Sequence, residues 1–112
     1  MQDETITNDV HNLLYVLANM KSEDAIYALL QDLFTAREIR ETSQRLLVAK
    51  MLNEGMSYTE IEARTHISAT TIARVSKCLS QGAGGYSAAL KLLDSKNTVV
   101  PNSNLTSNNT IS

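Results

Sequence analysis

The clearest structural pattern in the chain lies at residues 57–80, which read SYTEIEARTHISATTIARVSKCLS. Ser57 and Glu60 fit a capping box, in which a hydroxyl and a carboxylate satisfy free amides where a helix begins. Ser68 is placed to cap a second helix a few residues after the first one ends. Two short helices joined by about three residues are typical of a helix-turn-helix.

Apolar residues at fixed offsets are expected to lock the two helices together. Counted from the first of them, the others follow 6, 11 and 14 residues later, which matches the interlocking contacts of the motif. Leu79 extends the same apolar face. The interlocking residues are Ile61, Ile67, Ile72 and Val75.

The same spacing leaves the other side of the second helix facing solvent. In a helix-turn-helix, the start of the second helix reads base edges in the major groove of DNA. Small side chains there allow a close approach, and a threonine hydroxyl can bond either kind of base. Arginine and lysine suit phosphate or guanine, and the free amides at the helix start favour a phosphate. The predicted DNA-binding residues are Ser68, Ala69, Thr70, Thr71, Arg74 and Lys77.

Charge is unevenly distributed along the chain, whose formal net charge is −2. Residues 1–34 hold six acids and one base, which gives −5, whereas residues 63–80 hold Arg64, Arg74 and Lys77 and no acid. A local positive patch of this kind suits the DNA backbone. The near-neutral total and the acidic N-terminal part leave a second function open, a helical protein–protein interaction module without DNA binding.

Two side chains in this stretch admit more than one interpretation. His66 stands where such turns often hold a glycine with positive φ, a conformation that histidine tolerates. It is either a surface turn residue or a functional one, which contacts phosphate or responds to pH. Cys78 is the single cysteine, and helical periodicity predicts a buried structural thiol rather than a nucleophile.

No catalytic or metal-binding constellation accompanies these residues in the sequence. A lone cysteine without ligand-spaced histidines forms neither a metal site nor an internal disulfide, and it suits a reducing cytosol. Since there is no phosphate-binding loop and no supported carboxylate pair, we expect neither an enzyme nor a cofactor. The apolar run at residues 13–18 is too short to span a bilayer, and acids precede it, so we expect a cytoplasmic protein.

Helical periodicity continues on both sides of residues 57–80, and no stretch alternates like a half-buried strand. The class is therefore all-α, with about six helices. Thr35 and Glu38 form another capping box, Gly55 suits a left-handed helix end, and Asn8 or Asp9 is the expected cap of the first helix. The first expected helix runs from 9 to about 20, and the second begins at 23 after a cap at Ser22. The others lie at about 36–54, 58–65, 69–80 and 86–94. The expected organisation is a flexible N-terminus at 1–8, a helical domain at 9–94 and a disordered tail at 95–112.

The stretch from about Leu33 to Leu79 resembles the Trp repressor superfamily. The residues that carry the resemblance are Thr35-Ala-Arg-Glu38, Gln44-Arg45-Leu46, Met51-Leu52-Asn53-Glu54-Gly55, Met56-Ser57 and Ala69-Thr70-Thr71-Ile72-Ala73-Arg74. More narrowly, the chain looks like the YerC/YecD branch of that superfamily. The pattern of that branch is close to Gln44-Arg45-Leu46, Val48-Ala49-Lys50-Met51-Leu52 and Arg74-Val75-Ser76-Lys77-Cys78-Leu79.

The resemblance implies a transcriptional regulator that works as an intertwined homodimer. The N-terminal helices of one chain would wrap around those of the other, in agreement with the broad apolar face of residues 39–52. A two-fold dimer is expected to bind double-stranded DNA at a pseudo-palindromic site. Its half-sites would lie about 34–36 Å apart, or a multiple of that, as in helix-turn-helix dimers generally, the Trp repressor among them.

The resemblance also indicates a possible effector pocket, made of Thr35, Arg45, Thr71, Arg74, Val75 and Cys78. In the Trp repressor two arginines hold tryptophan, and Arg45 and Arg74 match them. However, Val75 replaces a glycine beside the indole, and Cys78 replaces a serine near the amino group. A β-branched side chain would fill the slot, and an unpaired buried amine is costly, so we expect no tryptophan binding. The arginines would hold another anion or pair with acids, namely Glu38, Glu41 or Glu60.

Overall fold

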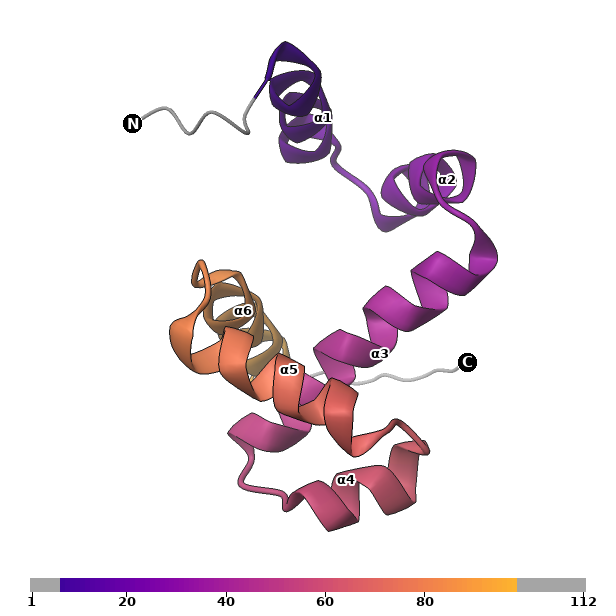
Figure 1. Ribbon diagram of the computed structural model, residues 1–112. Helices are drawn as coiled ribbons and strands as arrows, with labels where there is room; N and C mark the ends of the chain where they lie inside the picture. Colours follow the sequence, from indigo (N-terminus) through magenta and orange to yellow (C-terminus); the bar gives the residue numbers. More distant parts are fainter. Residues whose placement is uncertain (1–6, 99–112) are drawn as a thin grey trace, which may run out of the picture. The chain divides into compact units, whose positions relative to one another are not determined.

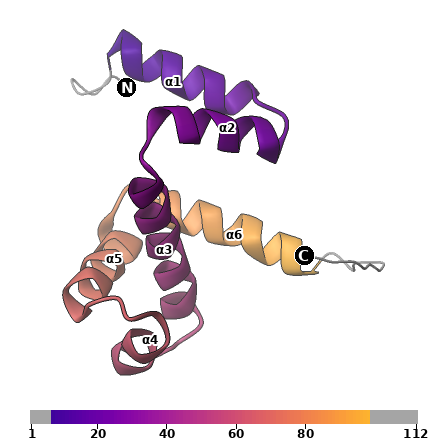
Figure 2. The same cartoon turned by 90° about the vertical axis from the view of Figure 1, so that its right-hand side faces the viewer.

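A computed structural model describes residues 7–98, which form six helices and no strand (Figure 1 and, turned by 90°, Figure 2). The helices are α1 (Asn8–Asn19), α2 (Glu23–Leu33), α3 (Ala36–Asn53), α4 (Tyr58–Thr65), α5 (Ala69–Gln81) and α6 (Gly85–Thr98). The all-α prediction is therefore confirmed. None of these described helices is long and apolar enough to cross a membrane.

Most helix starts lie where the capping residues predict them. Ser22 accepts a hydrogen bond from the Ala25 amide at 3.0 Å, and Gly55 ends α3 with a φ of 87°. The prediction for α1 was wrong by one residue, because Thr7, in extended conformation, supplies the capping hydroxyl instead of Asn8 or Asp9. The last helix continues to Thr98 rather than 94. The rest of the predicted tail and residues 1–6 lie outside the described part of the chain.

Contacts divide the chain into two compact units, residues 1–42 and 43–112. The first unit contains α1, α2 and the beginning of α3, and neither α1 nor α2 has a buried residue. Eight of its large apolar side chains are instead exposed. They are Val10, Leu13, Leu14, Tyr15, Val16, Tyr27, Leu33 and Phe34.

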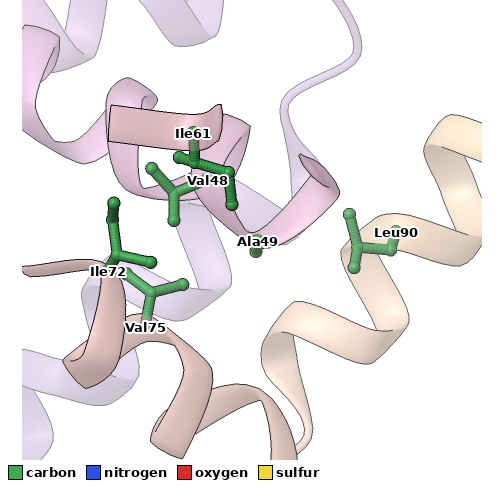
Figure 3. Close-up of a cluster of buried hydrophobic side chains, with 6 residues drawn as sticks. All are labelled: Val48, Ala49, Ile61, Ile72, Val75 and Leu90. Carbon is green, nitrogen blue, oxygen red and sulfur yellow. The ribbon is translucent and has the colours of Figure 1, made fainter. Parts of the chain in front are cut away.

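The second unit has a hydrophobic core to which four helices contribute (Figure 3). Its buried residues are Val48 and Ala49 of α3, Ile61 of α4, Ile72 and Val75 of α5, and Leu90 of α6. Full burial of a side chain the size of valine or isoleucine is worth about 1.5–3 kcal/mol. α5 contacts both α4 and α6, so the core fixes the buried side of α5 and leaves its other side free.

Candidate nucleic-acid interface

The interlocking contacts predicted between α4 and α5 are present. Ile61, Ile72 and Val75 are buried, while Ile67 in the connecting turn and Leu79 are half-buried against the same core. Three residues join the helices, so the length of the turn is that of the predicted motif.

The turn itself begins with a left-handed residue. His66 has φ 62° and ψ 19°, and its backbone N–H donates to the Glu62 carbonyl oxygen at 2.8 Å. It is the one non-glycine residue with positive φ in the described part of the chain, which confirms the conformation predicted for it. Its side chain is exposed, and a phosphate-contacting role stays a prediction.

Serine side chains cap both helices. Ser57 Oγ accepts from the Glu60 amide at 3.1 Å, but the Glu60 carboxylate pairs with Arg64 at 3.0 Å, so the predicted capping box forms only by half. Ser68 Oγ accepts from the Thr71 amide at 3.2 Å and donates to Thr71 Oγ1 at 3.2 Å. The first turn of α5 is therefore stabilised by hydrogen bonds from its own capping side chains.

The structure places the predicted DNA-binding residues on one exposed part of α5. Ser68, Ala69, Thr70, Arg74 and Lys77 are exposed, and Thr71, whose hydroxyl bonds with the Ser68 cap, is half-buried. Within the described residues, neither Arg74 nor Lys77 has a side-chain ion pair. The cations Arg74 and Lys77 are thus accessible to a ligand, as are the small side chains of Ala69 and Thr70 in the first turn of α5.

The buried position predicted for Cys78 is wrong, since its thiol is exposed. Each residue turns an α-helix by about 100°. Cys78 therefore lies roughly 90° away from the centre of the buried arc that Ile72, Val75 and Leu79 define. Helical periodicity suggested the inner half of α5, but Cys78 lies outside the buried arc, on the far side of Val75, and its thiol reaches solvent.

The predicted effector residues on α5 differ in their exposure. Val75 points into the core and is 1% exposed, whereas Arg74 and Cys78 point to solvent from the same helix. Arg45, on the part of α3 within the second unit, is exposed and has polar interactions of its own. Thr35 belongs to the first unit.

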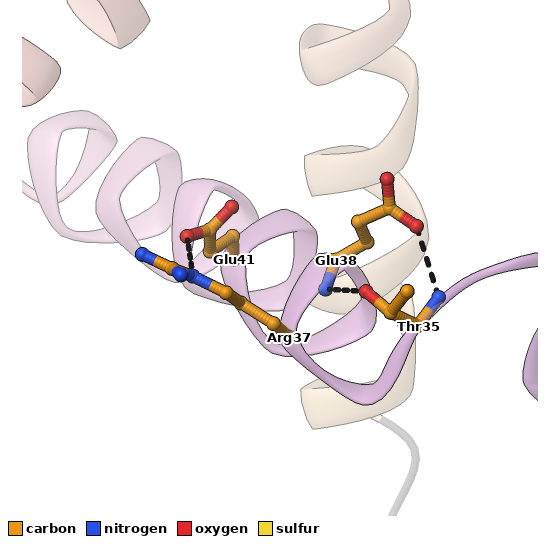
Figure 4. Close-up of polar contacts among 4 residues, drawn as sticks. All are labelled: Thr35, Arg37, Glu38 and Glu41. Carbon is orange, nitrogen blue, oxygen red and sulfur yellow. Dashed lines mark hydrogen bonds and ion pairs between the residues drawn. The ribbon is translucent and has the colours of Figure 1, made fainter.

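The acids that were expected to neutralise these arginines have other partners (Figure 4). Glu38 Oε1 accepts from the Thr35 amide at 2.9 Å, and Thr35 Oγ1 accepts from the Glu38 amide at 3.1 Å, so this capping box is complete. Glu41 pairs with Arg37 at 3.1 Å. Together with the Glu60–Arg64 pair, these contacts engage all three carboxylates locally.

Thr65 is a residue of this region that sequence reasoning missed. Its hydroxyl donates to the Ile61 carbonyl oxygen at 2.7 Å and accepts from the Ile67 amide at 3.1 Å. The signal available in the sequence was a hydroxyl residue directly before a residue that takes the left-handed conformation.

The first unit carries an open hollow of about 410 Å³. Its lining comes from α2 and the start of α3, and it combines aromatic and aliphatic side chains with one amide and one guanidinium. The lining residues are Tyr27, Gln31, Phe34, Ala36, Ile39 and Arg40.

Comparison with known proteins gives consistent matches over most of the chain. The family model of the Trp repressor protein matches residues 8–94. A Bacillus subtilis (strain 168) protein of uncharacterised function, YerC, is 38% identical over 88 residues, which are 79% of this chain and 85% of that protein. The crystal structure of a TrpR-like protein from Eubacterium eligens ATCC 27750 has a TM-score of 0.74 and 36% identity, over 79% of this chain and 91% of that one. A crystal structure from Staphylococcus aureus reaches the same TM-score with 31% identity, over 80% of this chain and 89% of that one.

Proposed function

Because the chain belongs to the Trp repressor family, we propose that it is a sequence-specific, DNA-binding transcriptional regulator. The observation that carries the proposal is the exposed side of α5, where Ala69, Thr70, Arg74 and Lys77 stand free of the core. The core holds the opposite side of α5 through Ile72 and Val75. α4 and α5 then act as a helix-turn-helix whose second helix enters the major groove.

Each exposed group on α5 has a role suited to its chemistry. Ala69 and Thr70, in the first turn, come close to the base edges, and the Thr70 hydroxyl makes a base contact. The amides at the start of α5 that the Ser68 cap leaves free face a phosphate, since a helix N-terminus favours an anion. Arg74 and Lys77 neutralise phosphates or bond to guanine.

The regulator would act as a homodimer. The large apolar side chains that remain exposed on α1 and α2 support this assembly, since neither helix has a buried residue. Extensive exposed apolar surface on a stable protein marks an interaction site. The hollow beside Phe34 and Ile39 would receive apolar side chains of the second copy. A two-fold dimer of this kind would bind a pseudo-palindromic site on double-stranded DNA in the cytoplasm.

Tryptophan would not control this regulator. Val75 is part of the core, and its side chain would occupy the space that the family's glycine leaves for an indole. Cys78 offers a weak thiol in place of a hydroxyl, so a charged amine there would lose a hydrogen-bond partner. Arg45 and Arg74 remain as groups that could hold a different anion.

Selection of bound sequences from a random pool of double-stranded DNA tests the proposal. The full chain is expected to enrich an inverted repeat, and the Thr70→Val variant is expected to shift the preferred base at one position of each half-site. Uniform weakening by Thr70→Val would show that Thr70 does not read sequence. No enrichment at low salt, where phosphate contacts are strongest, would reject DNA binding and favour a protein–protein interaction module.

A further inference from the structure

The Thr65 hydroxyl connects the two sides of the turn between α4 and α5. It donates to the Ile61 carbonyl oxygen, one helical turn back, at 2.7 Å. It also accepts from the Ile67 amide, two residues ahead, at 3.1 Å. We call this pair of hydrogen bonds the Thr65 bridge. The side chain is half-buried, so the bridge is partly shielded from water.

The Ile67 amide needs this acceptor because of how α4 ends. His66 is left-handed, and its N–H bonds to the Glu62 carbonyl oxygen at 2.8 Å. This helix end has a single backbone hydrogen bond, unlike the Schellman motif, which has two. The N–H of the next residue, Ile67, is therefore left without a helix carbonyl as its acceptor. Since Ile67 packs half-buried against the core, an unmade hydrogen bond there would be costly.

The bridge acts where the direction of α5 is set. Ile67 is the last residue before the Ser68 cap, and its side chain is fixed by the core while its amide is fixed by Thr65. A backbone held at both points leaves little freedom in the angle at which α5 leaves α4.

We infer that the Thr65 hydroxyl is the positioning group of the helix-turn-helix, holding α5 at the angle that presents Thr70 and Arg74 to DNA. Thr65 does not touch DNA in this scheme; it acts through Ile67 and Ser68. The consequence for DNA rests on the proposed function, whereas the bridge itself can be tested without DNA.

The DNA test compares Thr65→Val with Thr65→Ser in the full chain, using the enriched DNA. Valine keeps the shape and loses the hydroxyl, so affinity is expected to fall by about fivefold to tenfold, the worth of one hydrogen bond. Serine restores the hydroxyl and is expected to restore affinity. Ser80→Ala is the control, because Ser80 bonds only to carbonyls of α5 itself, those of Ser76 and Lys77. Equal affinity of Thr65→Val and the unchanged chain, or an equal loss in Ser80→Ala, would overturn the inference.

Amide hydrogen exchange gives a readout that does not depend on DNA. In the unchanged chain the Ile67 amide is expected to exchange slowly, and in Thr65→Val about tenfold faster. Should the unchanged chain bind no DNA, the proposed function fails, and the Ile67 exchange rate alone decides for or against the bridge. Should Thr65→Val not fold, fast exchange of Ile67 in the unchanged chain or in Thr65→Ser still overturns the inference.

Discussion

Val75 contributes to the core of the second unit and is also the residue on which the proposed lack of tryptophan binding depends. The family carries a glycine at this position, beside the indole of tryptophan, and here a β-branched side chain is 1% exposed in the core. Valine in place of that glycine adds apolar contacts in the core, and it also takes up the space that an indole would need. Reversing it would therefore cost stability, through both a cavity and the low helix propensity of glycine.

We expect calorimetric titration of the unchanged chain with tryptophan to give no binding heat up to about 1 mM, an affinity equivalent to about −4 kcal/mol. The matched variant is Val75→Gly with Cys78→Ser, which restores both the space and the hydroxyl, and it is expected to bind measurably. Its melting temperature should be lower, because the core loses Val75. Micromolar binding by the unchanged chain would contradict the role given to Val75.

Arg74 and Lys77 are expected to supply phosphate contacts rather than sequence preference. Changing both to alanine should weaken binding to all sequences and reduce the slope of log affinity against log salt by about 4, since each copy of the dimer loses two phosphate contacts. Lys91→Ala with Lys96→Ala on α6 is the charge-matched control and should leave the slope unchanged. The measurement is a fluorescence anisotropy titration at several salt concentrations, and an equal loss in both double variants would indicate a merely long-range effect of net charge.

At the scale of the helix, the features that could be predicted are those encoded within a few residues. Ser22, Thr35, Ser57 and Ser68 were expected as caps, and each accepts an amide hydrogen bond in the structure. Competition between neighbours was harder to foresee. The Glu60 carboxylate pairs with Arg64 instead of completing its capping box. Arg64 lies four residues further along the helix, where a basic side chain competes for the same carboxylate.

Substitutions of Ser68 can separate the effect of the helix cap on stability from the effect of a negative charge on DNA binding. Ser68→Ala should lower the free energy of unfolding by about 1 kcal/mol, since the cap is lost. Ser68→Asp keeps a capping oxygen and complements the helix dipole, so stability should stay within about 0.5 kcal/mol. DNA affinity is nevertheless expected to fall further in Ser68→Asp, because a carboxylate stands where a phosphate is expected.

Denaturant unfolding and DNA titration of the same samples check this prediction. Ser22→Asp, the same exchange at the cap of α2, is the control and should change neither property. If Ser68→Asp binds DNA as well as the unchanged chain, the amides at the start of α5 do not face a phosphate.

At the scale of the whole molecule, the sequence shows which residues are apolar, but it does not predict which surface covers them. The pattern at α1 and α2 indicates amphipathic helices, and the structure adds that neither helix has a buried residue within one chain. Local periodicity cannot distinguish a face that packs on its own chain from one that packs on a second copy. The hollow at Tyr27 and Phe34 was missed for a related reason, since it forms only where α2 and α3 meet.

Leu14, which is 50% exposed on α1, provides the test of the dimer. The unchanged chain is expected to sediment at twice the 12.3 kDa mass of one chain, and Leu14→Glu should shift it toward the monomer, because a carboxylate would be buried in an apolar interface. Asn12→Glu adds the same charge on the opposite side of α1 and should leave the dimer intact. A Leu14→Glu monomer would also bind an isolated half-site about as well as the full repeat, because affinity for two half-sites depends on their joint engagement. An unchanged chain that sediments as a monomer at micromolar concentration would contradict the proposed assembly.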